Sequence, residues 1–223
     1  MEVKQRTRRP RGSLTPELIL DAAEEVAQNG FDAVSVRAVA GPLNAAPMAL
    51  YRHFATKEAL VEALLDRVLG RFVPESPTGD WRGDLRNFAR AHRRLLDRHP
   101  WALAPLFNHP SPGPNAVRIG EHALGIMRDA GFDEERAVAT FSGLIALNYG
   151  WASFSSARLA DPSYAEGVRD ALATLPVAEY PHTVAAADEL ADYASDRHYD
   201  LVLDQLLPSS PGSASRQSHG ISP

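Results

Sequence analysis

The window between Asp32 and Glu58 contains no acidic residue, in a chain that holds 28 Asp and Glu. The outward side of the helix expected in this window carries small, apolar and basic residues: Ala46, Met48, Ala49, Tyr51, Arg52 and His53. Small and apolar side chains pack against base edges and thymine methyl groups, while Arg or His reaches polar acceptors. The window therefore favours a surface that approaches nucleic acid. The competing interpretation is a short connecting helix that packs on the body of the protein.

Other kinds of chemistry have little support in the sequence. The absence of cysteine excludes disulfides, thiol catalysis and cysteine-ligated metals. His92 and His99 lie on one helix face, with Glu121 and His122 elsewhere, but their spacing is not a recognised metal-ligand motif. An all-α enzyme that uses His92 and His99 is an alternative, although no activated nucleophile, phosphate loop or metal motif supports it. We expect no enzymatic activity, no cofactor and no metal site.

The charge of the chain is unevenly distributed. The net charge is −5, which taken alone argues against binding to nucleic acid. Residues 1–14 oppose this average, because Glu2 is outnumbered there by five cations: Lys4, Arg6, Arg8, Arg9 and Arg11. We expect a basic arm that reaches the DNA backbone or minor groove. The alternative is a tail whose charge only aids solubility.

Periodicity and turn residues predict an all-α fold. Apolar residues recur at helical spacing in almost every segment, and no alternating run predicts a convincing strand. Thr15 caps a first helix with Pro16 in its first turn, and Gly30 ends it. Ser35 caps a second helix, which ends near Pro42.

A turn and two further helices follow. The turn surrounds Asn44, the third helix opens at Ala46 and Pro47, and Thr56 caps the fourth. Two short helices joined by about four residues and braced by a preceding helix form a helix-turn-helix, which presents its later helix to the DNA major groove. The sequence therefore predicts a DNA-binding domain over residues 15–69.

The residues of this domain occur in an order that resembles the TetR family of bacterial transcriptional regulators. The resemblance is carried by the runs TPELILDAA at 15–23, GFD at 30–32, SVRAVA at 35–40, PMALYRHF at 47–54 and KEAL at 57–60. It covers about residues 13–69, and ordered motifs of this length rarely match by chance. Beyond them the likeness is architectural, to the longer helical domain of the tetracycline-repressor branch.

The resemblance and the residue types together assign nine residues to DNA binding: Ser35, Arg37, Pro47, Met48, Ala49, Tyr51, Arg52, His53 and Lys57. In the family pattern, Ser35 and Arg37 lie beside the phosphate backbone and Lys57 grips a phosphate from the start of the fourth helix. The opening of the recognition helix, residues 47–49, meets base edges. Helix N-termini add oriented amides for the same phosphates.

Tyr51 and His53 typically contact phosphates or bases in the family, with packing between helices as the alternative for Tyr51. Two positions depart from the family pattern. Asn44 stands in the turn where Gly is usual, but Asn tolerates the left-handed conformation, so we expect the turn to survive. Pro42 is expected to shorten the second helix, and this departure changes the register of Arg37 on the backbone relative to the family pattern.

A larger helical domain for effector binding and dimerisation is expected over residues 80–207. Its predicted helices cover 81–98, 115–130, 134–158 and 183–207, with a broken segment at 100–107. Asp80 and Asp133 are the expected caps of the first and third of these helices. Residues 208–223 are rich in Ser, Pro and Gly and are expected to form a disordered tail.

Two of these helices are expected to form a homodimer interface. The helix at 134–158 is apolar nearly all round and needs cover on every face. In the helix at 183–207, apolar and small residues recur at steps of three and four, as in a packed helix pair. In related regulators these helices form a four-helix bundle with their copies, and we assign seven residues to it: Val138, Ile145, Ala187, Ala191, Ala194, His198 and Leu201. The alternative is packing within one chain.

Aromatic residues of the second domain suit a site for a small apolar molecule, and its candidate lining is His92, His99, Trp101, Phe107, Asn148 and Trp151. An ordinary aromatic core is the alternative. No apolar run is long enough to span a bilayer and no secretory signal is present, so a cytoplasmic location without a membrane partner is expected. The sequence predicts a homodimeric repressor that binds a near-palindromic operator and is released by an effector. An activator or a ligand-independent regulator is the alternative.

Overall fold

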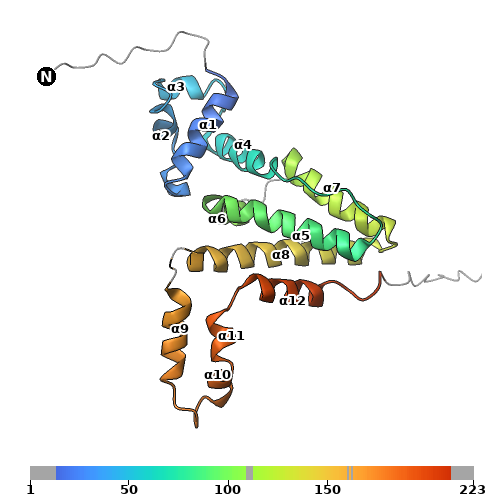
Figure 1. The fold of residues 1–223 in the computed structure, drawn as a ribbon. Coiled ribbons are helices and arrows are strands. Elements are labelled where there is room, and N and C mark those ends of the chain that lie inside the picture. The colour runs from blue at the N-terminus through green and yellow to red at the C-terminus, as the bar shows by residue number, and fades with distance from the viewer. Residues whose placement is uncertain (1–13, 109–112, 160, 162, 212–223) are drawn as a thin grey trace, which may run out of the picture. The chain divides into compact units, whose positions relative to one another are not determined.

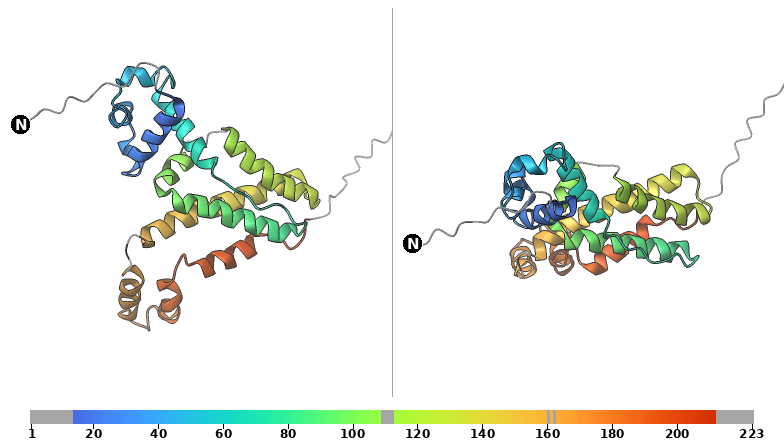
Figure 2. Two further views of the ribbon diagram at one scale, coloured as in Figure 1. Left: turned by 45° about the horizontal axis from the view of Figure 1, so that its top comes forward. Right: turned by 90° about the horizontal axis from the view of Figure 1, so that it is seen from above.

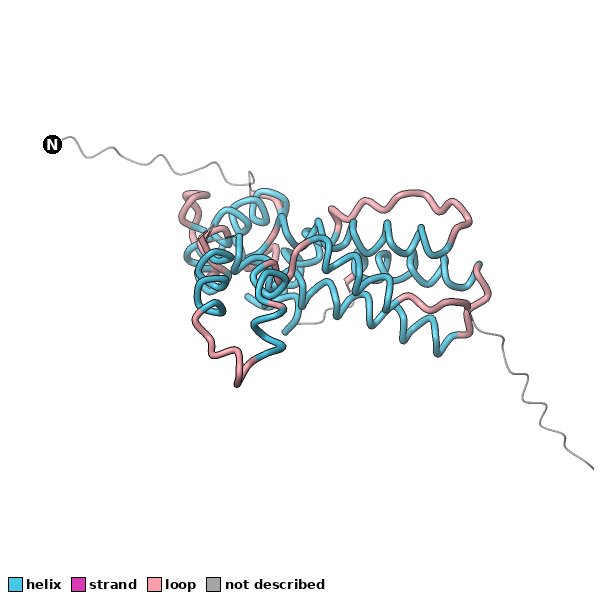
Figure 3. Tube along the Cα trace, turned by 60° about the horizontal axis from the view of Figure 1, so that its bottom comes forward, coloured by secondary structure: helices cyan, strands magenta, loops and turns pink. Residues whose placement is uncertain are grey.

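The computed structural model describes residues 14–108, 113–159, 161 and 163–211, and all regular structure within these ranges is helical (Figures 1 and 3). The all-α fold expected from the sequence is confirmed. Residues 1–13 of the predicted basic arm and 212–223 of the predicted tail lie outside the described residues.

The chain packs as two compact units. Unit 1 contains the residues up to Phe72 together with Trp101–Ile119, and unit 2 contains Val73–Pro100 together with the residues from Gly120 onward. The chain therefore leaves unit 1 and returns to it before it completes unit 2. These two units differ from the two domains expected from the sequence. Residues 101–119 were expected in the second domain, but they pack with the first unit.

Unit 1 holds the predicted helix-turn-helix. Its elements are α1 (Pro16–Ala27), the 3-10 turn η1 (Phe31–Ala33), α2 (Val36–Ala40), α3 (Pro47–Leu50), α4 (Lys57–Leu69), α6 (Leu103–Asn108) and the start of α7 (Pro114–Asp129). Its core is aliphatic and includes Ile19, Ala23, Val39, Leu50, Leu60 and Leu64. Helices as short as α2 and α3 are not stable alone, so the packing of α2 against α1 and of α3 against α2 holds them in place.

The predicted helix starts in unit 1 are confirmed at the level of single hydrogen bonds. The hydroxyl oxygens of Thr15, Ser35 and Thr56 each accept a hydrogen bond from the backbone N–H three residues later, at 3.3, 3.1 and 3.0 Å. Each bond satisfies a donor that the first turn leaves without a helical partner. Three hydroxyl side chains thus fix where α1, α2 and α4 begin.

Unit 2 is a helical bundle with a projecting helical hairpin (Figure 2). Its elements are α5 (Trp81–Arg98), most of α7, α8 (Glu134–Leu159), α9 (Tyr164–Ala173), α10 (Pro181–Ala185), α11 (Ala187–Ala191) and α12 (Asp196–Leu206). The helix α8 packs along α5 and α12, while α9 lies beside α11 in the hairpin. The predicted cap of α8 is confirmed, since Asp133 Oδ1 accepts a hydrogen bond from the backbone N–H of Arg136 at 2.8 Å.

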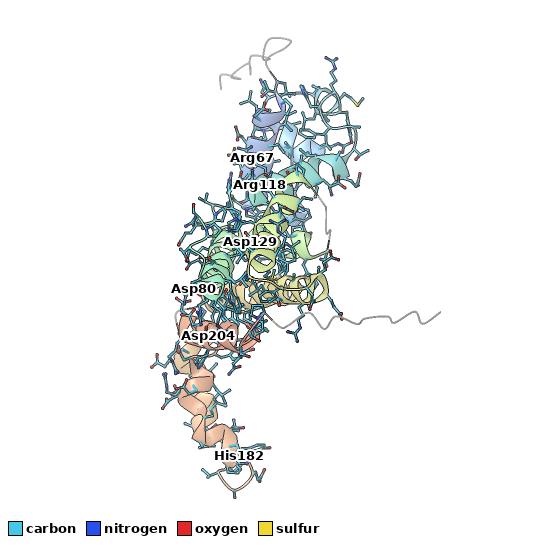
Figure 4. The ribbon with its side chains drawn as sticks, turned by 90° about the vertical axis from the view of Figure 1, so that its right-hand side faces the viewer. Arg67, Asp80, Arg118, Asp129, His182 and Asp204 are labelled. Atoms are coloured by element: carbon cyan, nitrogen blue, oxygen red, sulfur yellow. The ribbon has the colours of Figure 1, made fainter. Side chains whose placement is uncertain are left out.

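An arginine–aspartate ladder joins α5 to α12. Its ion pairs are Arg86–Asp204 at 2.6 Å, Arg90–Asp200 at 2.9 Å and Arg93–Asp196 at 2.7 Å (Asp204 is labelled in Figure 4). Partly exposed pairs of this kind contribute little stability individually. Because arginines and aspartates recur at steps of three or four on both helices, the pairs form only in one register, and they set which side of α12 faces α5.

The continuous helix predicted at 183–207 is wrong, because the segment is broken into α10, α11 and α12. The sharpest break lies before Ser195, where Ala194 adopts a left-handed backbone with φ +65°. The indole N–H of Trp151 donates a 3.1 Å hydrogen bond to the carbonyl oxygen of Ala194, and Ser195 caps α12 through the N–H of His198. A tertiary contact from α8 therefore holds a bend that helical periodicity does not predict.

Three smaller differences concern local structure. The segment expected to be broken at 100–107 forms the 3-10 turn η2 (Pro100–Ala102) and α6, and α9 was not predicted at all. The side chain of Asp80 makes no capping bond to α5. Instead the carboxylate of Asp84, in the first turn of α5, accepts hydrogen bonds from the backbone N–H groups of Thr78 and Gly79 at 2.9 and 3.1 Å. These bonds hold the segment that precedes α5 against the start of the helix.

Candidate nucleic-acid interface

The turn between α2 and α3 has the geometry expected of it. Asn44 adopts a left-handed conformation with φ +50°, and its backbone N–H donates to the carbonyl oxygen of Gly41 at 3.0 Å. The N–H of Ala45 returns to the carbonyl oxygen of Ala40 at 3.1 Å, which closes the end of α2. The expectations that the turn survives with Asn44 in place of Gly and that the second helix ends near Pro42 are both confirmed.

The helix α3 is anchored on one side and exposed on the other. Leu50 is 1% exposed and fixes the helix to the core, whereas Met48 is 71% exposed and Tyr51 is 41% exposed. The helical turn continues past α3, because the backbone N–H groups of His53 and Phe54 donate to the carbonyl oxygen of Leu50 at 2.9 and 3.0 Å. An exposed methionine on an anchored helix is available for contact with base edges.

The cations near α3 differ from those farther along α4. Arg37, Arg52 and Lys57 are exposed and form no ion pair with any residue that the structure describes. By contrast, Arg67 and Arg71, farther along α4, are both paired with acids of α1. Basic side chains near α3 are thus exposed and form no ion pair among the described residues, while those farther along α4 join it to α1.

The ion pairs between α4 and α1, Arg67–Asp21 and Arg71–Glu24, were not predicted from the sequence. Arg71 makes two hydrogen bonds to the carboxylate of Glu24, at 2.5 and 2.6 Å, and these bonds raise the pKa of the guanidinium. Arg67 pairs with Asp21 and also donates to the carbonyl oxygen of Glu17 at 3.3 Å. A signal was present, because acids three residues apart on α1 match bases four residues apart on α4.

The remaining predicted DNA-binding residues differ in exposure. Pro47 and His53 are exposed, whereas Ser35 and Ala49 are half-buried. Ser35 already uses its hydroxyl oxygen as the cap of α2, so its O–H group is the part free to donate to a phosphate. The nine residues lie between the start of α2 and the start of α4, within the acid-free window.

Three of the six candidate effector residues come together in the centre of unit 2. The side-chain amide of Asn148 donates to the carbonyl oxygen of Ala89 at 3.0 Å and lies 3.1 Å from Nδ1 of His92. The hydroxyl of Tyr199 donates to Oδ1 of Asn148 at 2.7 Å, and its ring meets Trp151 edge-on. Burial lowers the pKa of His92 to about 4, so its imidazole is neutral at physiological pH.

The other three candidates are not part of this cluster. His99 follows the last turn of α5, and Trp101 and Phe107 belong to unit 1, where Phe107 is 70% exposed. A groove of about 250 Å³ does occur in unit 2, but it is lined by two pairs of the arginine–aspartate ladder, Arg90–Asp200 and Arg93–Asp196, together with Arg94, Asp97 and Tyr199. None of the six candidates lines it.

Tyr199 was missed because the predicted register of the last helix was wrong. The expected continuous helix turned His198 inward, but the bend at Ala194 resets the register. Tyr199 and Leu203, four residues apart, become the buried positions of α12. The sequence pattern does not predict this change of register, because the change depends on the hydrogen bond from Trp151 to the carbonyl oxygen of Ala194.

The predicted dimer residues divide into two groups. Ala191 and Ala194 are covered by their own chain, at 0% and 5% exposure, and so are not available to a partner. Val138 on α8 and Leu201 on α12 are both more than half exposed. Ile145, Ala187 and His198 are half-buried. The most exposed of the seven predicted residues, Val138 and Leu201, therefore lie on α8 and α12.

No three or more His, Asp or Glu side chains in the described part of the chain are grouped so that they could hold a metal ion. Among the same residues, no helix is both long enough and apolar enough to cross a membrane.

Two family models account for most of the sequence. The model described as "Bacterial regulatory proteins, tetR family" matches residues 19–64, and that described as "Tetracyclin repressor-like, C-terminal domain" matches residues 73–208. The chain belongs to the TetR family. Both halves of the family architecture are thus present, and the resemblance seen in residues 13–69 extends to the second domain.

Curated TetR-like relatives are transcriptional regulators. An HTH-type transcriptional regulator of Saccharopolyspora erythraea is 34% identical over 162 residues, which are 72% of this chain and 68% of the relative. The HTH-type transcriptional repressor DrrR1 of Streptomyces coeruleorubidus is 33% identical over 136 residues, which are 60% of this chain and 50% of DrrR1. This chain therefore spans between half and about two thirds of the length of these relatives.

Solved TetR structures share the fold. The TetR family protein ActR of Streptomyces coelicolor, determined in complex with actinorhodin, superposes with a TM-score of 0.78 at 25% identity, over 87% of this chain and 95% of ActR. TetR family proteins are DNA-binding transcription factors and not enzymes, and this chain is one of them. The alternative of an all-α enzyme that uses His92 and His99 is thereby excluded.

Proposed function

We propose that this protein is a homodimeric repressor that binds a near-palindromic operator and is released by a small apolar effector. The observation that carries the proposal is the surface around α3, where Met48 is exposed and the exposed cations Arg37, Arg52 and Lys57 form no ion pair with any described residue. The relative DrrR1, named a transcriptional repressor, supports the repressor mode. Because operator DNA lies in the bacterial cytoplasm, the protein acts there.

On DNA, α3 enters the major groove and the flanking helix starts contact the backbone. Residues 47–49, with Arg52, meet base edges, and Tyr51 and His53 contact bases or phosphates. Ser35, Arg37 and Lys57 bind phosphates, helped by the free amides at the starts of α2 and α4. The basic arm ahead of α1 adds phosphate or minor-groove contacts.

The second copy covers α8 and α12. Val138 and Leu201 are exposed on these helices, and α12 lies close to α8, since a Cβ on Gly143 would be 3.3 Å from Leu206. A two-fold axis through this surface produces a four-helix bundle and places two recognition helices about one or more DNA turns apart. The interface proposed from sequence is kept for Val138, Ile145, Ala187, His198 and Leu201.

The effector binds in the second domain, beside the aromatic cluster of Phe88, Phe141 and Tyr149 with the polar pair His92 and Asn148. Apolar walls with a few fixed polar groups are typical of small-molecule sites. ActR supports this proposal because it was solved with actinorhodin bound. Of the other candidates, Trp151 lies beside this cluster through its edge-on contact with Tyr199, while His99, Trp101 and Phe107 lie outside it and stay predictions from sequence. A ligand-independent regulator or an activator is the alternative mode.

The test is selection of genomic fragments by the purified protein, followed by sequencing of the bound DNA. The proposal expects recovery of a few inverted-repeat sites, with Lys57→Ala and Tyr51→Ala weakening binding. Arg128→Ala, which removes an exposed cation at the far end of α7, is the matched control and leaves affinity unchanged. Recovery of no specific fragment contradicts DNA regulation. Reporter expression with and without the gene separates a repressor from an activator.

A further inference from the structure

A carboxylate of α4 caps the N-terminus of α7. The backbone N–H of Asn115 donates to Oδ1 of Asp66 at 2.9 Å, and the side-chain amide of Asn115 donates to Oδ2 of Asp66 at 2.7 Å. The same amide also donates to the backbone carbonyl oxygen of Asp66 at 3.0 Å. One residue of α7 is therefore held by one residue of α4 through three hydrogen bonds.

The sequence at the start of α7 makes this external cap necessary. The residue before α7 is Gly113, which has no side chain to cap the helix, and Pro114 has no N–H. Asn115 therefore carries the first free N–H of the helix, and Asp66 supplies its acceptor. An anionic acceptor at a helix N-terminus also interacts favourably with the helix dipole.

Both sides of the contact depend on glycine. A Cβ on Gly113 would overlap the carboxylate of Asp66, and a Cβ on Gly70 would lie 3.0 Å from the side-chain amide of Asn115. Arg118, one turn farther along α7, donates to the carbonyl oxygen of Gly70 at 3.3 Å (Arg67 and Arg118 are labelled in Figure 4). The end of α4 and the start of α7 are thus fitted closely at two successive turns.

The helix α4 connects this contact to the proposed DNA interface. Lys57 begins the helix and Asp66 lies nine residues later, about 14 Å along the axis at 1.5 Å per residue. Arg67 and Arg71 join the same end of α4 to α1. A displacement of Asp66 is therefore shared by α4 and by the helix against which α2 packs.

The helix α7 connects the contact to the aromatic cluster of unit 2. It runs without interruption from Pro114 to Asp129. A Cβ on Gly120 would be 3.6 Å from the ring of Phe141, and the ring of His122 stacks on Phe88 at 6.2 Å. A molecule that rearranges Phe88 or Phe141 therefore acts on the same helix that Asp66 caps.

We propose that the Asp66–Asn115 cap is the positioning contact through which α7 and the DNA-binding helices affect each other. The proposal rests on the proposed function, because it names the route by which effector state reaches the DNA interface. Coupling between two sites is reciprocal, so a change in α7 that alters operator affinity implies that operator binding alters α7. The contact is therefore testable with DNA alone.

The experiment is hydrogen exchange of the full chain, with and without an operator duplex recovered by genomic selection. In the wild-type protein, DNA is expected to slow exchange in peptides covering residues 120–129 by about fivefold or more. In Asp66→Ala, DNA still binds but this slowing is lost. Asp21→Ala, which removes an acid that pairs with the next residue of α4, is the matched control and keeps the slowing. If Asp66→Ala only destabilised the start of α7, exchange would change by the same factor with and without DNA, and the slowing caused by DNA would remain.

Each outcome bears on one claim. If DNA binds and exchange of residues 120–129 does not change, or if Asp66→Ala responds as the wild type does, the coupling contact is refuted while DNA binding stands. If no duplex binds, the proposed function fails and the coupling proposal fails with it. Should Asp66→Ala not fold, Asn115→Ala removes two of the three hydrogen bonds and leaves the backbone cap in place.

Discussion

The hydroxyl of Tyr199 on α12 donates a 2.7 Å hydrogen bond to the amide oxygen of Asn148 on α8. The amide nitrogen of Asn148 in turn contacts α5, at the carbonyl of Ala89 and at His92. One buried asparagine therefore links three helices of the bundle of unit 2. Buried polar groups are costly when a partner is missing, so this network fixes how the helices pack.

The neutral state of His92 predicts a pH-dependent stability. Its folded-state pKa of about 4 lies below the ordinary value of 6.5, so the unfolded chain binds this proton first as the pH falls. The contribution of neutral His92 to the free energy of unfolding is complete above pH 6.5 and is lost as the pH approaches 4. The free energy of unfolding should fall by roughly 2 kcal/mol from this group between pH 7 and pH 5.

Chemical denaturation at pH 7, 6 and 5 measures this effect. His92→Gln removes the titrating group and should show a smaller decrease over the same range. His122, whose pKa burial also lowers, is present in both proteins and cancels in the comparison. Parallel pH dependence of the two proteins would contradict a buried neutral His92.

The left-handed bend predicts a stabilising substitution. Ala194 has φ +65°, a conformation that costs a residue with a Cβ about 1–2 kcal/mol but costs Gly almost nothing. Ala194→Gly should therefore raise the free energy of unfolding by about 0.5–1 kcal/mol after the greater entropy of the unfolded glycine is subtracted. Thermal or chemical denaturation checks this. Destabilisation by the amount typical of Gly within a helix would show that α11 and α12 are continuous.

Two substitutions of Ser35, the cap of α2, distinguish its role in stability from its proposed role in DNA binding. Ser35→Ala removes the acceptor for the N–H of Ala38 and should cost about 1 kcal/mol of stability. Ser35→Asp keeps a capping oxygen, so stability should be retained, but it places a negative charge beside phosphate and should weaken DNA binding. Denaturation curves and fluorescence anisotropy on the selected operator measure the two effects. Full operator affinity in Ser35→Asp would show that Ser35 does not lie at the backbone.

The proposed dimer surface predicts a change in oligomeric state. Leu201 is 52% exposed, so Leu201→Glu should not disturb the core, but it places two charges in the apolar centre of a dimer. Sedimentation velocity should show a shift from dimer to monomer. Val177→Glu alters a residue that is 61% exposed in the loop before α10 and serves as the control. An unchanged dimer in Leu201→Glu would place the interface elsewhere.

Local signals predicted unit 1 better than unit 2. Thr15, Ser35 and Thr56 act on the N–H three residues later, and Asn44 adopts its turn from its own backbone preference, so sequence alone locates these features. The bend at Ala194 depends on Trp151, 43 residues away, and no periodicity reveals it. The capping role of Asp66 was missed for the same reason, because its partner lies 49 residues later.

The most direct test of the central claim is the operator affinity of Met48→Glu. Met48 is 71% exposed on α3, so the substitution should leave the thermal midpoint unchanged. If α3 enters the major groove, a carboxylate at this position loses a base-edge contact worth about 1–3 kcal/mol, and affinity should fall by about fivefold or more. Val117→Glu, at a 58% exposed position of α7, should bind as the wild type does. Wild-type affinity in Met48→Glu would contradict the assignment of α3 as the recognition helix.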